Sequence, residues 1–226
     1  MFEGLNTIYL LLIALILPLL AQGYVMLTYN KYKKEKNSYD ITGFDAAREI
    51  LDKEGLQDMY IVETSGTLSD HYDPVRKTIK LSRDIFHGKS IAAVAIAAHE
   101  VGHAIQDKEG HFFMKIRSLI FPVVKLGTQF AYIVLFVGII LESLNLIWLA
   151  IGLVGLGLLF QIVTLPVEFD ASKKAKAFLT KYNLADNKTL RGSSSVLIAA
   201  ALTYVAGVVA SAMQLLRLVL IFGRRN

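Results

Sequence analysis

Two histidines and a glutamate stand close together in the stretch His-Glu-Val-Gly-His at residues 99–103. The alanine-rich apolar run before it predicts a helix that is capped by Ser90 and continues to about residue 107. On such a helix His99 and His103 project from one face, so both imidazoles can bind one metal ion. Glu100 lies about 100° round the helix, where its carboxylate can take a proton from a water molecule. The stretch therefore predicts part of a catalytic zinc site, with Glu100 as general base.

Two histidines and a water leave a tetrahedral zinc ion short of one protein ligand. The metzincin pattern would place a third histidine at position 109, where this chain has Glu109. Glu109 and His111 are near in sequence but lie beyond the expected end of the helix. Glu168 is the better candidate, because a glutamate from a second helix completes the site in gluzincin-type enzymes. Pro166 favours the start of a new helix, with Glu168 in its first turn.

Three further residues could support the reaction. Asp170 could accept a hydrogen bond from a ligand imidazole and fix its tautomer, or it could be an ordinary surface residue. His71 and Tyr72 lie in a polar stretch before Pro74 and could stabilise an oxyanion if that stretch borders the cleft. The alternative is a polar turn without a catalytic role. The adjoining strand could also bind an extended peptide by adding it to the edge of the sheet.

Four apolar segments, at about residues 7–28, 118–141, 144–165 and 196–216, are each close to the length that crosses a bilayer. Hydrophobic residues make up 54% of the chain and charged residues 19%, which suits a protein that lies partly in lipid. The net charge is +5. Because the basic residues stand beside the apolar segments, we interpret them as topology signals and expect no nucleic-acid partner.

The distribution of basic residues gives an orientation for the segments. Lysines at 31–36 follow the first segment, and six basic residues lie between positions 173 and 191. The turn at residues 142–143 between the second and third segments has no Lys or Arg. Basic flanks stay in the cytoplasm, so we predict that the first segment is an uncleaved anchor with its C-terminal end inside. Two spans separate His103 from Glu168, which places both on the cytoplasmic side.

The C-terminal segment is ambiguous. If it crosses the membrane, Arg217, Arg224 and Arg225 end up outside, against the trend of the other loops. It could instead be a helix that lies at the interface. Lys125, inside the second segment, could mark a pathway through the membrane, and the simpler interpretation is a side chain that extends to the interface.

The polar stretch between the first two spans predicts a small α+β catalytic domain. A helix begins at Thr42 and ends at Gly55, and strands are predicted at 59–63 and 78–81 with a turn at Asp73-Pro74. The expected fold is a mainly α membrane protein with about four transmembrane helices and a small zincin-like cytoplasmic domain. We expect five segments: an anchor at 1–29, the catalytic domain at 30–117, a transmembrane hairpin at 118–165, a cytoplasmic helix with the third ligand at 166–193, and a transmembrane or interfacial helix at 194–226.

The chain resembles the YugP-type neutral zinc metallopeptidases of bacterial membranes over nearly its whole length. Three stretches carry the resemblance: Asp70–Pro74, Ile91–Gln106 and Leu165–Ser172. The resemblance implies a zinc-dependent endopeptidase of the cytoplasmic membrane. It also implies that His99, His103 and Glu168 bind one zinc ion per chain and that Glu100 is the catalytic base.

The chain is more remotely similar to HtpX-like membrane proteases and to the CAAX prenyl endopeptidases. In those proteins an aspartate typically follows the third-ligand glutamate by four residues. This chain has Ser172 at that place and its aspartate at position 170.

We therefore expect a membrane-embedded zinc endopeptidase that faces the cytoplasm and acts on peptides or membrane proteins. The alternative is a non-catalytic zinc-binding membrane module or sensor. Structural zinc sites normally take four protein ligands, so the glutamate beside His99 and the absence of cysteine favour catalysis. A small transporter would be expected to have several charges within its spans. Lys125 alone is such a charge in this sequence, which disfavours a transporter.

Overall fold

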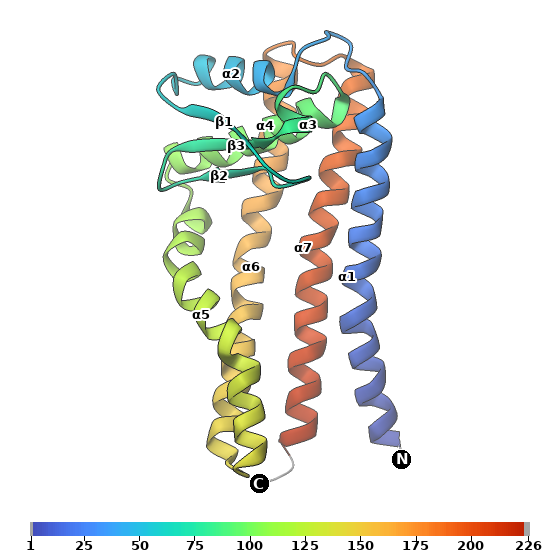
Figure 1. Ribbon diagram of the computed structural model, residues 1–226, viewed down its shortest axis with the longest axis vertical. Coiled ribbons are helices and arrows are strands. Elements are labelled where there is room, and N and C mark those ends of the chain that lie inside the picture. Colours follow the sequence, from blue (N-terminus) through green and yellow to red (C-terminus); the bar gives the residue numbers. More distant parts are fainter. Residues whose placement is uncertain (1, 224–226) are drawn as a thin grey trace. The chain divides into compact units, whose positions relative to one another are not determined.

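The computed structural model describes residues 2–223, with side chains from residue 7 onwards, and consists mainly of helices with one small sheet (Figure 1). The elements are α1 Phe2–Lys34, α2 Gly43–Lys53, β1 Tyr60–Thr64, β2 His71–Asp73, β3 Thr78–Ser82, α3 Arg83–Phe86, α4 Ile91–Lys108, α5 Phe112–Ile140, α6 Leu144–Lys181 and α7 Asn187–Phe222. Helices α1, α5, α6 and α7 are long and apolar enough to cross a membrane. The predicted fold class is confirmed.

Helix α7 contains the segment for which an interfacial position was the alternative, and its 36 residues are sufficient in length and hydropathy for a membrane span. Of the three arginines that made this segment ambiguous, Arg217 lies in α7. Arg224 and Arg225 lie outside the described residues.

The chain forms two compact units. One contains the described parts of Met1–Gln22, Lys115–Leu165 and Leu202–Asn226, and the other contains Gly23–Met114 and Pro166–Ala201. These units follow the contacts within the chain, whereas the five predicted segments follow membrane crossings. The five-segment division therefore stays a prediction.

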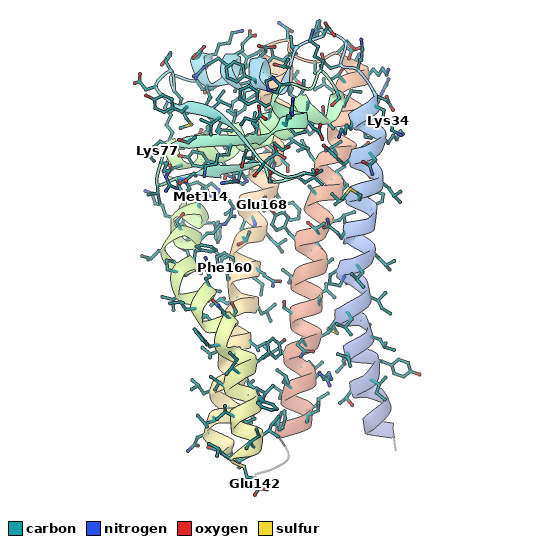
Figure 2. All side chains as sticks on the ribbon, viewed as in Figure 1. Lys34, Lys77, Met114, Glu142, Phe160 and Glu168 are labelled. Atoms are coloured by element: carbon teal, nitrogen blue, oxygen red, sulfur yellow. The ribbon has the colours of Figure 1, made fainter. Side chains whose placement is uncertain are left out.

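The first unit packs apolar side chains between its long helices. The rings of Phe121 on α5 and Phe160 on α6 lie 5.9 Å apart between centroids, and Phe160 is labelled in Figure 2. A Cβ on Gly157 of α6 would lie 2.8 Å from the side chain of Thr128 on α5. A glycine at this position therefore lets the two helices approach closely, as small residues do in membrane bundles.

The second unit contains the sheet, which has the strand order β1-β3-β2. β1 is parallel to the central strand β3, and β2 is antiparallel to it, with Tyr72 opposite Ile79. β1 and β3 match the two predicted strands. The third strand, β2, forms where only a turn was predicted at Asp73-Pro74, because residues 71–73 pair with β3 before the chain turns. β2 is thus an edge strand whose outer side is not paired within the sheet.

Helix α4 forms the centre of the second unit. Ser90 caps it, and its hydroxyl accepts a hydrogen bond from the backbone N–H of Ala93 at 3.1 Å. The alanines in its first half are buried, so α2 and the sheet can pack closely against it. The helix ends at Lys108, one residue beyond the predicted end. The predicted helix for the His-Glu-Val-Gly-His stretch is therefore confirmed.

One prediction for the second half of the chain is wrong. Pro166 does not begin a new helix, because α6 continues without interruption from Leu144 to Lys181. A proline inside a helix removes one hydrogen bond and crowds the preceding turn, at a cost of about 3 kcal/mol. The burial of Val167, Ala171 and Ala175 on the following turns offsets this cost. Glu168 therefore lies well inside a long helix and not in a first turn.

Candidate metal centre

Three side chains of the second unit converge, His99 and His103 from α4 and Glu168 from α6. Glu168 is labelled in Figure 2. One ligand atom from each lies within 4.8 Å of the others. The Nε2 atoms of His99 and His103 are 3.3 and 3.6 Å from Oε2 of Glu168. A tetrahedral zinc ion with bonds of about 2.0–2.1 Å separates its ligand atoms by about 3.3–3.4 Å. The spacing of these atoms fits one such ion.

The chemistry of the three donors also fits zinc. Two imidazole nitrogens and one carboxylate are the protein ligands of a catalytic zinc site, which leaves the fourth position for water. Glu168 is 1% exposed and His103 is 7% exposed. Carboxylates are almost never buried to this extent unless they are paired or bind a metal. The burial of Glu168 beside two histidines is therefore the arrangement expected of a metal centre.

Gln106, which the sequence analysis did not single out, orients His103. Its amide N–H groups donate to the backbone oxygen of Val167 at 2.7 Å and to Oδ2 of Asp170 at 2.9 Å. The amide oxygen of Gln106 is then an acceptor, and it lies 3.0 Å from Nδ1 of His103. The proton of the imidazole is thus held on Nδ1, and the lone pair of Nε2 points to the site. The signal in the sequence was the three-residue spacing from His103, which puts Gln106 on the same face of α4.

Ser172 supports the other imidazole. Its hydroxyl lies 3.3 Å from Nδ1 of His99. Ser172 follows Glu168 by four residues, so both side chains face α4 from the same side of α6. In this chain a serine, and not the aspartate expected from the remote resemblance, contacts the histidine at this place.

Asp170 lies one hydrogen bond further from the imidazoles than predicted. It accepts from the Gln106 amide, and the longer glutamine side chain stands between Asp170 and His103. Its Oδ2 atom is also 4.0 Å from Nε2 of His111. Asp170 is therefore connected to His103 through Gln106.

Glu100 lies on α4 beside the histidines, and 7% of its surface is exposed. Burial raises the pKa of Glu100 to about 7, with attraction to His99 opposing and repulsion from Glu168 adding to the effect. Its carboxylate also accepts a hydrogen bond from the backbone N–H of Tyr72. The edge strand β2 and the predicted general base are thus joined directly.

The side chains of His71 and Tyr72 have other partners. The Tyr72 hydroxyl donates to Oδ2 of Asp107 at 2.6 Å, and burial and this acceptor raise the pKa of the phenol. His71 is exposed, with Nδ1 2.8 Å from the backbone oxygen of Ser69. Within residues 7–223 neither side chain bonds to the converging trio. Their role in oxyanion stabilisation stays a prediction.

The two nearer alternatives for the third ligand lie outside the cluster. Glu109 forms an ion pair with Lys174 at 2.7 Å. His111 is near Asp170, and its Nδ1 accepts from the backbone N–H of Met114 at 3.4 Å. Among the described residues the group that could hold a metal contains Glu168 and neither of these two.

Gly102, inside the motif, sets the separation of α4 and α6 at the site. A Cβ added there would lie 2.7 Å from the backbone oxygen of Ala171. Because both residues lie inside helices, the clash can be relieved only if α4 and α6 move apart. Gly102→Ala is therefore expected to destabilise the protein by about 1–3 kcal/mol through overpacking and to weaken zinc binding. Thermal unfolding and zinc titration check both effects. Gly152→Ala is the matched control, because nothing lies within 4 Å of its added Cβ, and equal losses in both variants would contradict this explanation.

Removal of the Gln106 amide tests the support of His103. In Gln106→Ala the imidazole loses its acceptor, and zinc affinity is expected to fall about 10–100-fold. Competition with a fluorescent zinc chelator measures the change. Gln57→Ala is the control, since Gln57 is exposed and donates only to the backbone oxygen of Asp52. An unchanged affinity in Gln106→Ala would show that the hydrogen bond does not matter for metal binding.

Comparison with known proteins places this chain in a family. The family described as "Putative neutral zinc metallopeptidase" matches residues 7–223. The "Putative membrane protease YugP" of Bacillus subtilis (strain 168) is 44% identical over 215 residues, which cover 95% of this chain and 96% of that protein. No solved structure matches the chain. With a match over nearly its whole length, a cluster that fits zinc and four helices able to span a membrane, the chain belongs to this family of neutral zinc metallopeptidases.

Proposed function

We propose that this protein is an endopeptidase of the bacterial cytoplasmic membrane that uses one zinc ion per chain, bound by His99, His103 and Glu168. The observation that carries the proposal is the convergence of these three side chains, from two helices far apart in sequence, at the spacing of zinc ligands. Family membership supports zinc and proteolysis. The residue roles rest on the geometry.

When bound, zinc polarises the scissile carbonyl and lowers the pKa of the attacking water. The Glu100 carboxylate accepts the proton of that water on an oxygen and later delivers it to the leaving amine. The backbone N–H of Tyr72 interacts with the Glu100 carboxylate and favours its charged form. Gln106 keeps the proton of the His103 imidazole on Nδ1, away from the metal side, and the Ser172 hydroxyl can accept the proton of His99 Nδ1 in the same way.

The edge strand β2 suggests how a peptide binds. Its outer side is unpaired within the sheet, and Tyr72 on that strand already bonds to Glu100 through the backbone. An extended peptide that pairs with this edge would lie beside the general base, with main-chain hydrogen bonds giving affinity. This mode of binding accepts unfolded peptides or loops of membrane proteins.

The orientation of the site follows from the charges beside the spans. The lysines at the end of α1 and the basic residues between positions 173 and 191 favour the cytoplasmic side for both halves of the site. Helix α5 and the part of α6 before Glu168 lie between the two halves in sequence, so the chain can leave and return to that side. We propose a site that faces the cytoplasm.

Removal of the metal tests the proposed function directly. The purified full chain in detergent is expected to contain about one zinc per chain and to cleave an unfolded protein such as casein. Treatment with a chelator is expected to abolish cleavage, and added zinc is expected to restore it, while circular dichroism shows that the helices persist. A chain that binds zinc but cleaves neither casein nor a panel of membrane-protein substrates would support the non-catalytic module or sensor instead.

A further inference from the structure

A cavity lies at the end of α1, outside the metal centre. Its volume is about 450 Å³, and all of its lining belongs to the second unit. Five of its lining residues are basic and one is acidic: Lys33, Lys34, Lys36, Arg83, Lys89 and Asp84. They come from the last turn of α1, the residues just after it, α3 and the loop before α4. The proposed hydrolysis uses none of them.

The backbone fixes the shape of this cavity. The side-chain amide of Asn37 donates to the backbone oxygen of Lys89 at 2.8 Å, and an ion pair between Lys33 and Asp84 joins α1 to α3. A Cβ on Gly88 would lie 2.0 Å from the backbone oxygen of Asp84, so the loop fits only with glycine there. The cations therefore face a concave surface that exists before any ligand binds.

The basic residues that line the cavity outnumber the acidic residues that pair with them. Lys33 pairs with Asp84, and Lys89 pairs with Asp40 at 2.6 Å. Lys34, Lys36 and Arg83 are exposed and form no ion pair with any residue in the part of the chain that the structure describes. Three cations without an acidic partner create a positive potential around the cavity. This potential attracts an anion, and a bound anion reduces the repulsion among the cations.

The position of the cavity identifies the kind of anion. Lys33 and Lys34 belong to the last turn of α1, which is a candidate membrane span, and Lys34 is labelled at that end of the helix in Figure 2. Residues at the cytoplasmic end of a span meet the lipid headgroups, and basic clusters there attract anionic lipids. The volume lies within the range of small-molecule sites. We propose that this cavity binds the phosphate group of an anionic membrane lipid.

Binding by the full chain in detergent tests this proposal. Native mass spectrometry gives the Kd for short-chain phosphatidylglycerol, for short-chain phosphatidylcholine and for inorganic phosphate. Phosphatidylcholine carries the same phosphate with a compensating cation, so it controls for net charge. We expect phosphatidylglycerol to bind at least about tenfold more tightly than phosphatidylcholine, since each nearby Lys or Arg adds to the attraction for anionic lipid.

Two triple variants locate the site. Lys34→Gln/Lys36→Gln/Arg83→Gln is expected to lose the preference for phosphatidylglycerol. The matched control is Lys173→Gln/Lys176→Gln/Arg191→Gln, which removes the same charge from exposed residues of α6 and α7 and is expected to keep it. Circular dichroism verifies that both variants fold. Equal losses in the two variants, or a wild type without a preference, would overturn the site, and tight binding of inorganic phosphate alone would overturn a lipid as its ligand.

Discussion

Glu100→Gln is expected to lower kcat by about 10²- to 10⁴-fold while the zinc content stays near that of the wild type. The amide keeps the size of the side chain but cannot take a proton from the attacking water, and general base catalysis contributes a factor of this order. Glutamine can still accept the hydrogen bond from the backbone N–H of Tyr72, so the local structure is expected to persist. Peptide cleavage and elemental analysis of the same preparation measure the two quantities together.

Glu109→Gln is the matched control for this experiment. It makes the same chemical change at the C-terminal cap of α4, on an exposed residue whose partner is Lys174. Its kcat is expected to remain within about twofold of the wild type, as for a surface residue away from the reacting atoms. If Glu100→Gln cleaved as fast as Glu109→Gln, the role of Glu100 as general base would have to be abandoned.

Glu168→Ala is expected to weaken zinc binding by more than about 100-fold and to abolish cleavage at ordinary zinc concentrations. Loss of a residue that only supports a ligand already costs about 10–100-fold in metal affinity, so loss of the ligand itself is expected to cost more. The buried imidazole of His103 and the half-buried imidazole of His99 then remain with one protein ligand missing. Zinc titration of the purified variant, with cleavage assayed over a range of added zinc, measures the loss and shows whether metal restores turnover.

The other two candidate ligands provide the controls for Glu168. Glu109→Ala and His111→Ala are expected to retain zinc, since Glu109 pairs with Lys174 and His111 lies beside Asp170 and Met114. If Glu168→Ala kept its zinc and one of these two variants lost it, the residue replaced in that variant would be the third ligand. The three variants therefore decide the ligand set without a crystal structure.

Local patterns sufficed to predict much of this protein. Helix α4 follows from an alanine-rich run with a serine cap, and the four-residue spacing of His99 and His103 places both rings on one face. The long helices follow from apolar runs of the length of a bilayer. Glu168 was predicted as the third ligand because a glutamate from a second helix completes gluzincin-type sites, and it lies in the cluster with His99 and His103. Each of these features depends either on residues that are close together in sequence or on the lipid bilayer, which requires a whole segment to be apolar.

The features that were missed depend on contacts between distant segments. Gln106 orients His103 only because α6 supplies the backbone oxygen of Val167 and the carboxylate of Asp170 to its amide. The short strand β2 exists because β3 pairs with it, and three residues are too few for a recognisable alternation. The helix α6 passes through Pro166 because packing of the next turns outweighs a local preference. Tertiary packing decided all three.

The division of the metal centre between α4 and α6 also has a consequence for biosynthesis. Ser172, the last residue that contacts a ligand histidine, follows His99 by 73 residues, and both α5 and most of α6 lie between them. At about 5–20 residues per second a ribosome needs about 4–15 s to make that stretch. For most of this time the nascent chain carries the two histidines and Glu100 but not yet Glu168, the proposed third ligand. With the proposed ligand set, the metal centre is therefore incomplete until the ribosome has made the chain as far as Glu168.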